Sequence, residues 1–173
     1  MRRSTALLLV ILVTIIFGTM YVLLQQYGRS SANDQPMALA QSVADEFKNA
    51  SNQSTLPLGK LDITTSLQPF VIIYNKTYKP VAGTGYLDGK LPVIDKGVLQ
   101  NTKTDSYHKV TWEPKSGTRI ATVVVKVGDY YILGGQSLKP TEDRDSQMFK
   151  LVALGWLVSE IVVGGSYFLL NKR

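Results

Sequence analysis

The sequence predicts an α+β domain, built on an antiparallel sheet with an N-terminal amphipathic helix and flanked by two transmembrane helices. Three features carry this prediction: an apolar run near each end of the chain, a helical repeat after the first run, and a central group of β-branched and aromatic segments. The central group comprises residues 69–91 (PFVIIYNKTYKPVAGTGYLDGKL) and residues 119–138 (RIATVVVKVGDYYILGGQSL). Such segments bury an apolar face only by pairing with one another, so we expect one antiparallel sheet.

The two apolar runs have the length and composition of membrane-spanning helices. Residues 6–24 are 19 residues without a charge, which at the helical rise span roughly 28 Å, close to the hydrocarbon thickness of a bilayer. Residues 151–170 are 20 residues in which Glu160 is the one charge. We therefore expect an anchor at 1–25, an extracytoplasmic domain at 26–140, and a linker helix with a second transmembrane helix at 141–173.

A cleaved signal peptide is the alternative for the first run, because Arg2 and Arg3 suit the basic start of a signal. The apolar run, however, exceeds the roughly 7 to 15 residues of a signal's apolar core. The Ala-x-Ala site at residues 38–40 lies well beyond that run and inside a predicted helix. An uncleaved anchor is the better interpretation.

The net charge of +6 comes mostly from the ends of the chain. Between residues 26 and 148 there are 14 Lys and Arg against 12 Asp and Glu, a net charge of +2. The remaining basic residues flank the apolar runs, a pattern that indicates cytoplasmic ends and argues against a nucleic-acid partner. We expect both termini in the cytoplasm, the middle domain on the other side, and the lipid bilayer as the first partner.

The segments between the anchors follow a definite order. Asp34 and Pro36 begin a predicted amphipathic helix that continues to about residue 50 and covers the sheet. Residues 92–101 predict one or two helical turns with Ile94 and Val98 facing inward. Residues 108–112 alternate as a strand that ends at a turn over 113–117. Residues 139–147 predict a charged helix continuous with the second apolar run.

Three stretches together resemble a known family: PFVIIYNKTYKPVAGTGYLDGKLP, HKVTWEPKSGTRIATVVVKV and YYILGGQSL. The pattern is similar to the extracytoplasmic sensor region of bacterial membrane receptors, chiefly histidine kinases, with a PAS-like (Cache or PDC) fold. The resemblance implies a PAS-like sheet and a signal-input role. The sequence carries no phosphoacceptor histidine and no nucleotide-binding glycine motif, so we expect a sensor without its transmitter.

Residues that would carry enzymatic chemistry are scarce. There is no cysteine, His108 is the single histidine, and no Gly-x-Ser-x-Gly elbow occurs. The sequence Gly83-Thr84-Gly85 lacks the third glycine of a dinucleotide site, and Asp143 with Asp145 suits a solvated linker face. We expect no enzyme, no cofactor and no metal site.

The resemblance implies a ligand pocket between the sheet and its flanking loop. The residues expected to line it are aromatic side chains and one cation: Tyr74, Tyr86, Trp112, Arg119 and Tyr131. His108 or Thr111 would be the polar neighbours, and a small carboxylate or another polar organic ligand would suit such walls. The alternative is that these aromatic residues fill a solid core.

Glu160 is the most unusual residue of the second apolar run. A carboxyl group at the centre of a membrane costs on the order of 3 kcal/mol on insertion scales, so it should face protein or water. Gly155 and Ser159 form a small-x-x-x-small pair that permits close approach of another helix. We expect helix association through Gly155, Ser159 and Glu160, with a second copy or another membrane protein as partner. A tolerated carboxyl with local water is the alternative.

Two functions fit these expectations. A membrane-anchored sensor-like domain with a regulatory or signal-input role is the first. An accessory or assembly subunit of a membrane complex, which binds protein rather than a small ligand, is the second. An apolar-walled internal cavity would favour the sensor, whereas an exposed apolar patch on a solid domain would favour the accessory subunit.

Overall fold

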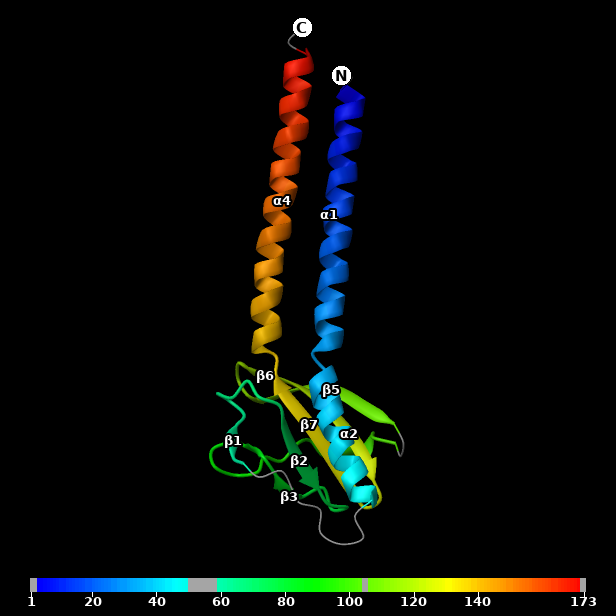
Figure 1. The fold of residues 1–173 in the computed structure, drawn as a ribbon, viewed down its shortest axis with the longest axis vertical. Coiled ribbons are helices and arrows are strands. Elements are labelled where there is room, and N and C mark those ends of the chain that lie inside the picture. Colours follow the sequence, from blue (N-terminus) through cyan, green and yellow to red (C-terminus); the bar gives the residue numbers. More distant parts are fainter. Residues whose placement is uncertain (1–2, 50–58, 104–105, 172–173) are drawn as a thin grey trace. The chain divides into compact units, whose positions relative to one another are not determined.

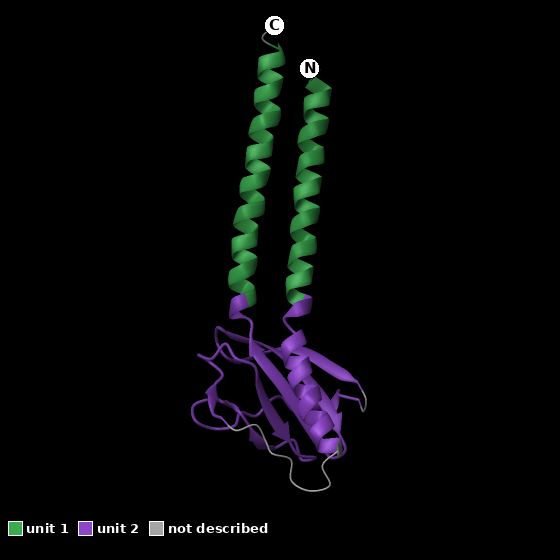
Figure 2. Cartoon of the chain, in the orientation of Figure 1, with its two compact units in different colours: residues 1–29, 141–173 green, residues 30–140 purple. Residues whose placement is uncertain are grey.

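The computed structural model describes residues 3–49, 59–103 and 106–171. The chain forms two compact units (Figure 2). Unit 1 contains residues 1–29 and 141–173, and unit 2 contains residues 30–140. Each unit has its own set of packed elements.

The elements follow one another in a simple order (Figure 1). Four helices are present in the described residues: α1 (Arg3–Ser31), α2 (Asp34–Asn49), α3 (Lys96–Gln100) and α4 (Lys139–Asn171). The strands are β1 (Leu61–Asp62), β2 (Phe70–Tyr74), β3 (Pro80–Gly83), β4 (Gly85–Tyr86), β5 (Tyr107–Lys115), β6 (Thr118–Val127) and β7 (Tyr130–Ser137).

Unit 2 is built on a five-stranded sheet in the order β3-β2-β7-β6-β5. Every neighbouring pair is antiparallel, which confirms the α+β class and the predicted antiparallel sheet. The two central stretches of the sequence meet where β2 pairs with β7, with Ile72 opposite Leu133. Both strands are interior, so their β-branched and aliphatic residues are buried on both faces.

Helix α2 covers one face of this sheet, as the helical repeat predicts, and packs on β6, β7 and β2 (Figure 1). Its buried residues Ala40, Val43 and Ala44 pack with side chains of β2, β6 and β7. The helix comes close because β7 has a glycine beneath it. A Cβ atom at Gly134 would overlap the Pro36 carbonyl oxygen and lie 3.2 Å from the Ala40 Cβ.

The opposite face of the sheet is covered by short elements. Strands β1 and β4 form a small parallel pair. Ile63, directly after β1, and Leu99 of helix α3 belong to a core cluster with Phe70 and Leu133. Asp95 caps α3, because its carboxylate accepts a hydrogen bond of 2.6 Å from the Gly97 N–H. The sheet is therefore buried on both sides, one covered by α2 and the other by α3 and the loops around it.

Two details differ from the sequence-based expectation. Strand β5 continues to Lys115 rather than ending at Trp112, with a register shift between these residues. The shift accommodates Pro114 on an edge strand, where proline is tolerated. In α3 the fully buried side chain is Leu99, whereas Val98 is only partly buried. Ile94 is buried, as predicted.

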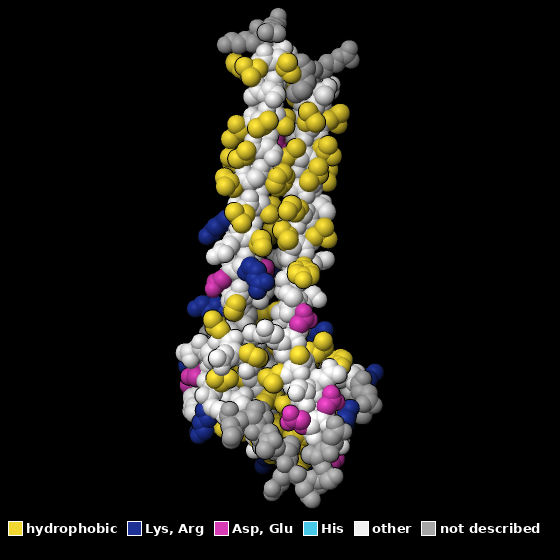
Figure 3. Space-filling model, viewed as in Figure 1, with side chains coloured by type: hydrophobic (Ala, Val, Ile, Leu, Met, Phe, Trp, Pro, Cys, Tyr) yellow, Lys and Arg dark blue, Asp and Glu magenta, His cyan; other side chains and the backbone are white. Residues whose placement is uncertain are grey.

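Unit 1 consists of two long helices. Both α1, of 29 residues, and α4, of 33 residues, are long and apolar enough to cross a membrane by length and composition. Exposed hydrophobic side chains cover most of the visible face of this helix pair, and charged side chains gather on unit 2 and on the neighbouring polar turns (Figure 3). The predicted linker helix and the second apolar run form one continuous helix, α4.

Candidate functional site

Three of the five predicted pocket residues face the core on the α3 side of the sheet, but they lie towards two different ends of it. Tyr74 and Tyr131 belong to this core cluster, and Trp112 packs against it. The Tyr131 ring lies 5.6 Å from the ring of Tyr78 and 5.5 Å from Lys126 Nζ. The structure thus brings Tyr74 and Tyr131 together as partners in the β2–β7 pairing. Trp112 pairs instead with Ile120, six residues along β6 from the residue that pairs with Tyr131.

Tyr74 is the more deeply buried of these two tyrosines. Its side chain is fully buried, and its hydroxyl donates a hydrogen bond of 3.0 Å to the Pro92 carbonyl oxygen. Burial raises the pKa of the phenol well above its ordinary value, and a backbone hydrogen bond from Ile94 opposes that rise. The hydroxyl fastens the loop before α3 onto the sheet.

The other two predicted residues lie apart from this cluster. Tyr86 is half-buried, and Lys60 Nζ lies 5.3 Å above its ring. Arg119 is exposed and precedes Ile120, which is buried in the α3-side core. Because successive strand residues face opposite sides, Arg119 lies on the α2 side, away from the three aromatic residues.

The two residues expected as polar neighbours of the pocket, His108 and Thr111, lie on opposite faces of the sheet. His108 Nδ1 lies 2.8 Å from the Val98 carbonyl oxygen, which ties β5 to the end of α3. Thr111 is exposed, and strand alternation places it on the face opposite Trp112. His108 therefore has a structural hydrogen bond on the α3 side, and Thr111 does not share that face.

The predicted association residues of α4 lie against α1 of the same chain. A Cβ atom at Gly155 would lie 2.9 Å from Phe17 Cε1, so this glycine permits close approach of the two helices. The Ser159 hydroxyl donates a hydrogen bond of 2.8 Å to the Gly155 carbonyl oxygen within α4. Glu160 Oε1 accepts a hydrogen bond of 3.4 Å from the Thr14 hydroxyl.

Thr14 links two polar groups of α4. Trp156 Nε1 donates a hydrogen bond of 3.1 Å to Thr14 Oγ1, and Thr14 in turn donates to Glu160. Such a chain satisfies an indole N–H, a hydroxyl and a carboxyl group inside an apolar surface, where an unpaired polar group is costly. This Trp156–Thr14–Glu160 chain is the polar centre of the helix pair.

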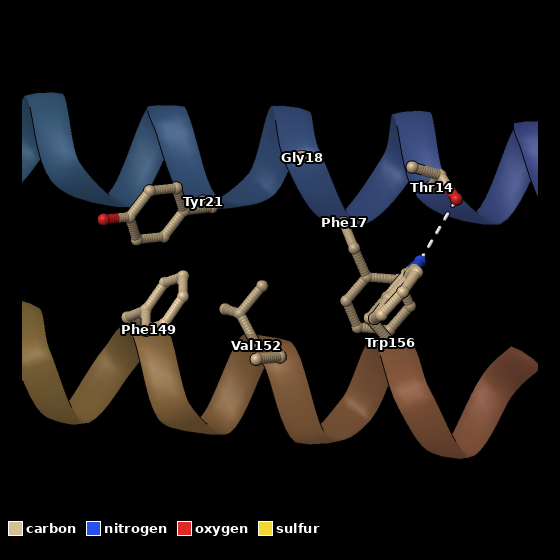
Figure 4. A pocket seen from close by; sticks show the side chains of 8 residues that line it. Thr14, Phe17, Gly18, Tyr21, Phe149, Val152 and Trp156 are labelled. Carbon is tan, nitrogen blue, oxygen red and sulfur yellow. Dashed lines mark hydrogen bonds between the residues drawn. The ribbon is translucent and has the colours of Figure 1, made fainter.

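An apolar groove of about 320 Å³ lies beside this polar centre (Figure 4). Its lining residues come from both helices: Thr14, Phe17, Gly18, Tyr21, Phe149, Val152, Ala153 and Trp156. The rings of Tyr21 and Phe149 meet edge to face with centroids 5.4 Å apart, a favoured aromatic geometry. Space remains at Gly18, where a Cβ atom would find nothing within 4 Å.

Sequence reasoning singled out Glu160 and Gly155 but missed Phe17, which lies against Gly155. Phe17 and Tyr21 are four residues apart, so they share one face of α1. The indole N–H of Trp156 was a second signal, because a tryptophan N–H within an apolar run usually finds an acceptor. These two patterns could have indicated the contact with α1.

A metal ion has no evident place in the described residues. In the ranges 3–49, 59–103 and 106–171, no group of three or more His, Asp or Glu side chains lies close enough to hold one. Buried side-chain polar atoms in these ranges all have hydrogen-bond partners.

A scan against protein-family models and searches of curated proteins and of solved structures found no match to this chain.

Proposed function

We propose that this chain is a two-pass membrane protein in which unit 2 is an extracytoplasmic, PAS-like domain with a signal-input role. Both termini are cytoplasmic in this proposal, and the domain acts by binding rather than by catalysis. The antiparallel sheet, the N-terminal helix on one face and the glycine-containing loop after β3 support the PAS-like assignment.

One observation carries the proposal: the central strand of the domain leads almost directly into the second apolar helix. Strand β7 ends at Ser137, and α4 begins at Lys139 and continues without a break to Asn171. The Leu138 N–H donates a hydrogen bond of 2.9 Å to the Arg119 carbonyl oxygen, so even the connecting residue is fixed to the sheet. A change in β7 would therefore reach α4 through a short, ordered connection.

The composition of the two units supports the membrane arrangement. The exposed apolar side chains of α1 and α4 would be costly in water but suit a bilayer. The basic residues that flank both apolar runs are typical of cytoplasmic ends. Long domains translocate largely regardless of their own charge, so the lysines of unit 2 are compatible with an extracytoplasmic position.

The buried Tyr74 is compatible with the second candidate, an accessory subunit that binds protein. Tyr74 has a fully buried side chain and an internally bonded hydroxyl. A ligand that used this hydroxyl would first have to displace the Pro92 carbonyl. A domain with this side chain fixed in its core suits contact with another membrane protein as well as it suits sensing.

Membrane topology is the first test, and the absence of cysteine in the sequence makes it direct. We predict that Lys76→Cys and Lys115→Cys will react with a membrane-impermeant maleimide on intact cells. Lys76 is 73% exposed, and Lys115 is also exposed, so burial does not protect either site. Asn171→Cys, at the end of α4, is the matched control and should react only after permeabilisation.

Protection of both domain positions until permeabilisation would place unit 2 in the cytoplasm and remove the extracytoplasmic sensor from consideration. Labelling of Asn171→Cys on intact cells would contradict the second membrane crossing. Labelling of both domain positions together with protection of Asn171→Cys supports the two-pass arrangement.

A further inference from the structure

A small cleft lies on the α2 side of unit 2, next to its β5 edge. Helix α2 packs over β6, β7 and β2, so the α2-facing side chains of β5 remain exposed. The cleft measures about 140 Å³. It lies on the opposite face of the sheet from the core that contains Tyr74 and Tyr131. Its lining residues are Gln41, Ala44, Asp45, Lys48, Ser106, Tyr107, Val125 and Lys126.

The floor of this cleft is apolar and its walls are polar. Ala44 is 1% exposed and Val125 is 8% exposed, and both belong to the core beneath α2. Gln41, Asp45 and Lys48 follow one another at spacings of four and three residues, so they form one stripe along α2. Hydroxyl-bearing Ser106 and Tyr107 stand on the opposite wall.

The two charged residues on the α2 wall of the cleft are not paired with each other. Within the described ranges of the chain, the ion pair that forms is Lys76 with Asp129, at 3.8 Å. Asp45 and Lys48 are one helical turn apart, which places their Cβ atoms about 5 to 6 Å from each other. The cleft therefore presents a carboxylate and an ammonium group side by side over an apolar floor.

Lys126 does not supply a second cation to this site. Its ammonium group lies 5.5 Å above the ring of Tyr131, on the α3 side of the sheet. The positive charge of the cleft therefore comes from Lys48. A ligand with only a carboxylate would pair with Lys48 alone. A ligand with only an ammonium group would pair with Asp45 alone.

We propose that this cleft binds a small ω-amino acid, with an ammonium and a carboxylate group separated by two or three carbons. The ammonium group would lie at Asp45, the carboxylate at Lys48, and the alkyl chain on Ala44 and Val125. The volume equals that of about four to five water molecules, which limits the ligand to a short chain. The methylene groups of an ω-amino acid would cover the apolar floor of Ala44 and Val125, which the single carbon between the charged groups of glycine could not do.

An ω-amino acid would be the signal in the proposed signal-input role, and the biological meaning of its binding rests on that role. Binding itself can be measured independently of membrane topology. The two proposals therefore fail separately. If the domain is labelled from outside but binds none of the probes, the membrane proposal stands and the proposed binding site in the cleft is wrong.

The experiment uses the full chain in lipid nanodiscs, with binding followed by ligand-observed NMR titration. The probes are 3-aminopropanoate, 4-aminobutanoate, glycine, propanoate and propylammonium. We expect the first two to bind at least about fivefold more tightly than the single-charge probes and glycine, because only they engage both charged side chains. Equal binding of propanoate or propylammonium would overturn the zwitterion assignment.

Charge-neutral variants locate the site. Asp45→Asn and Lys48→Gln should each weaken 3-aminopropanoate binding about tenfold. Lys76→Gln and Asp129→Asn neutralise the same residue types elsewhere on unit 2 and should leave binding unchanged. Both sets change exposed side chains, so folding should be preserved and is checked by the thermal transition. Unchanged affinity in Asp45→Asn and Lys48→Gln, or no binding of any probe, would contradict the proposal.

Discussion

At the scale of single residues, Tyr74 shows how one buried hydroxyl holds a covering loop on a sheet. The Tyr74 side chain lies in the α3-side core, and its hydrogen bond to the Pro92 carbonyl oxygen crosses 18 residues of sequence. Pro92 is itself buried. Loss of the hydroxyl would leave a buried carbonyl without its partner, which costs more than the net value of an average hydrogen bond.

We therefore predict that Tyr74→Phe lowers the free energy of unfolding of unit 2 by about 1 to 3 kcal/mol. Chemical denaturation of the full chain in nanodiscs, followed by tyrosine and tryptophan fluorescence, measures this. Tyr130→Phe is the matched control, because Tyr130 is 40% exposed and should change stability by less than about 0.5 kcal/mol. A destabilisation no larger than that of the control would show that the Pro92 contact contributes little.

At alkaline pH, the loss of unfolding free energy caused by Tyr74→Phe should shrink and then change sign. Burial raises the pKa of Tyr74 in the folded state above its ordinary value of 10.0. Below pH 10 the phenol is protonated in both states, so its stabilising contribution is fully present. Above pH 10 the unfolded chain loses the proton first, and wild-type stability falls by about 1.4 kcal/mol per pH unit from this group. Tyr74→Phe lacks this loss, so its stability should approach and then exceed that of the wild type. Parallel pH profiles would contradict the assigned burial effect.

At the scale of elements, the contact between α2 and β7 depends on a residue that has no side chain. A Cβ atom at Gly134 would overlap the Pro36 carbonyl oxygen at the start of α2. The helix cannot accommodate it by a side-chain rotation, because the obstructing atoms belong to its own backbone. Overpacking of this kind costs about 1 to 3 kcal/mol when the elements can shift.

We predict that Gly134→Ala lowers the thermal transition of unit 2 by about 5 to 15 °C while the sheet still forms. Differential scanning calorimetry measures the shift. Gly164→Ala is the control, because a Cβ atom there meets nothing within 4 Å. A transition of Gly134→Ala equal to that of the wild type would mean that α2 is not held closely on β7.

The elements also show how far local patterns determine the fold. Strands β2 and β7 were predictable because their β-branched and aromatic residues have few other stable arrangements. Helix α2 was predictable from its 3.6-residue repeat. The pair β1 with β4 was not, because two residues per strand carry no period and their pairing spans more than 20 residues of sequence. The extension of β5 was missed because Pro114 indicates a turn unless it lies on an edge strand.

The candidate pocket illustrates a different limit of sequence reasoning. Tyr74 and Tyr131 lie opposite each other on β2 and β7, because large aromatic residues on neighbouring strands tend to pack together, whereas Trp112 lies on the edge strand β5. Arg119 was added for its charge, although strand alternation already separates it from Ile120 and the aromatic face. The Asp45 and Lys48 cleft depends on where α2 crosses the sheet, and that crossing is fixed by Gly134 rather than by any local motif.

At the scale of the whole molecule, the chain divides into two units that are joined by continuous backbone elements. Both core clusters of unit 2 take their residues from positions 39–133. The helix pair has its own contacts, including the Trp156–Thr14–Glu160 chain. The backbone joins the two units at two places, α1 to α2 and β7 to α4, and the connection from β7 into α4 is the shorter.

This route can be tested with a reporter in the helix pair. The rings of Tyr21 and Phe149 are 5.4 Å apart, so Tyr21→Cys with Phe149→Cys can be bridged by a short bifunctional thiol reagent in a chain that otherwise lacks cysteine. Gly134→Ala perturbs β7 only three residues before that strand ends. We predict that Gly134→Ala, studied below its thermal transition, changes the bridging rate by about twofold or more, because coupling between sites is typically worth 1 to 3 kcal/mol.

The control interrupts the route without touching either end of it. Two glycines inserted between Glu142 and Asp143 weaken the helix by about 1 kcal/mol each, and in that background Gly134→Ala should no longer change the bridging rate. If Gly134→Ala leaves the rate unchanged even with α4 intact, β7 and the helix pair behave independently. The signal-input role would then be excluded, and the accessory subunit would become the better account of this protein. If Gly134→Ala still changes the bridging rate after the insertion, the coupling does not run through α4. The short connection between α1 and α2 is then the next one to interrupt.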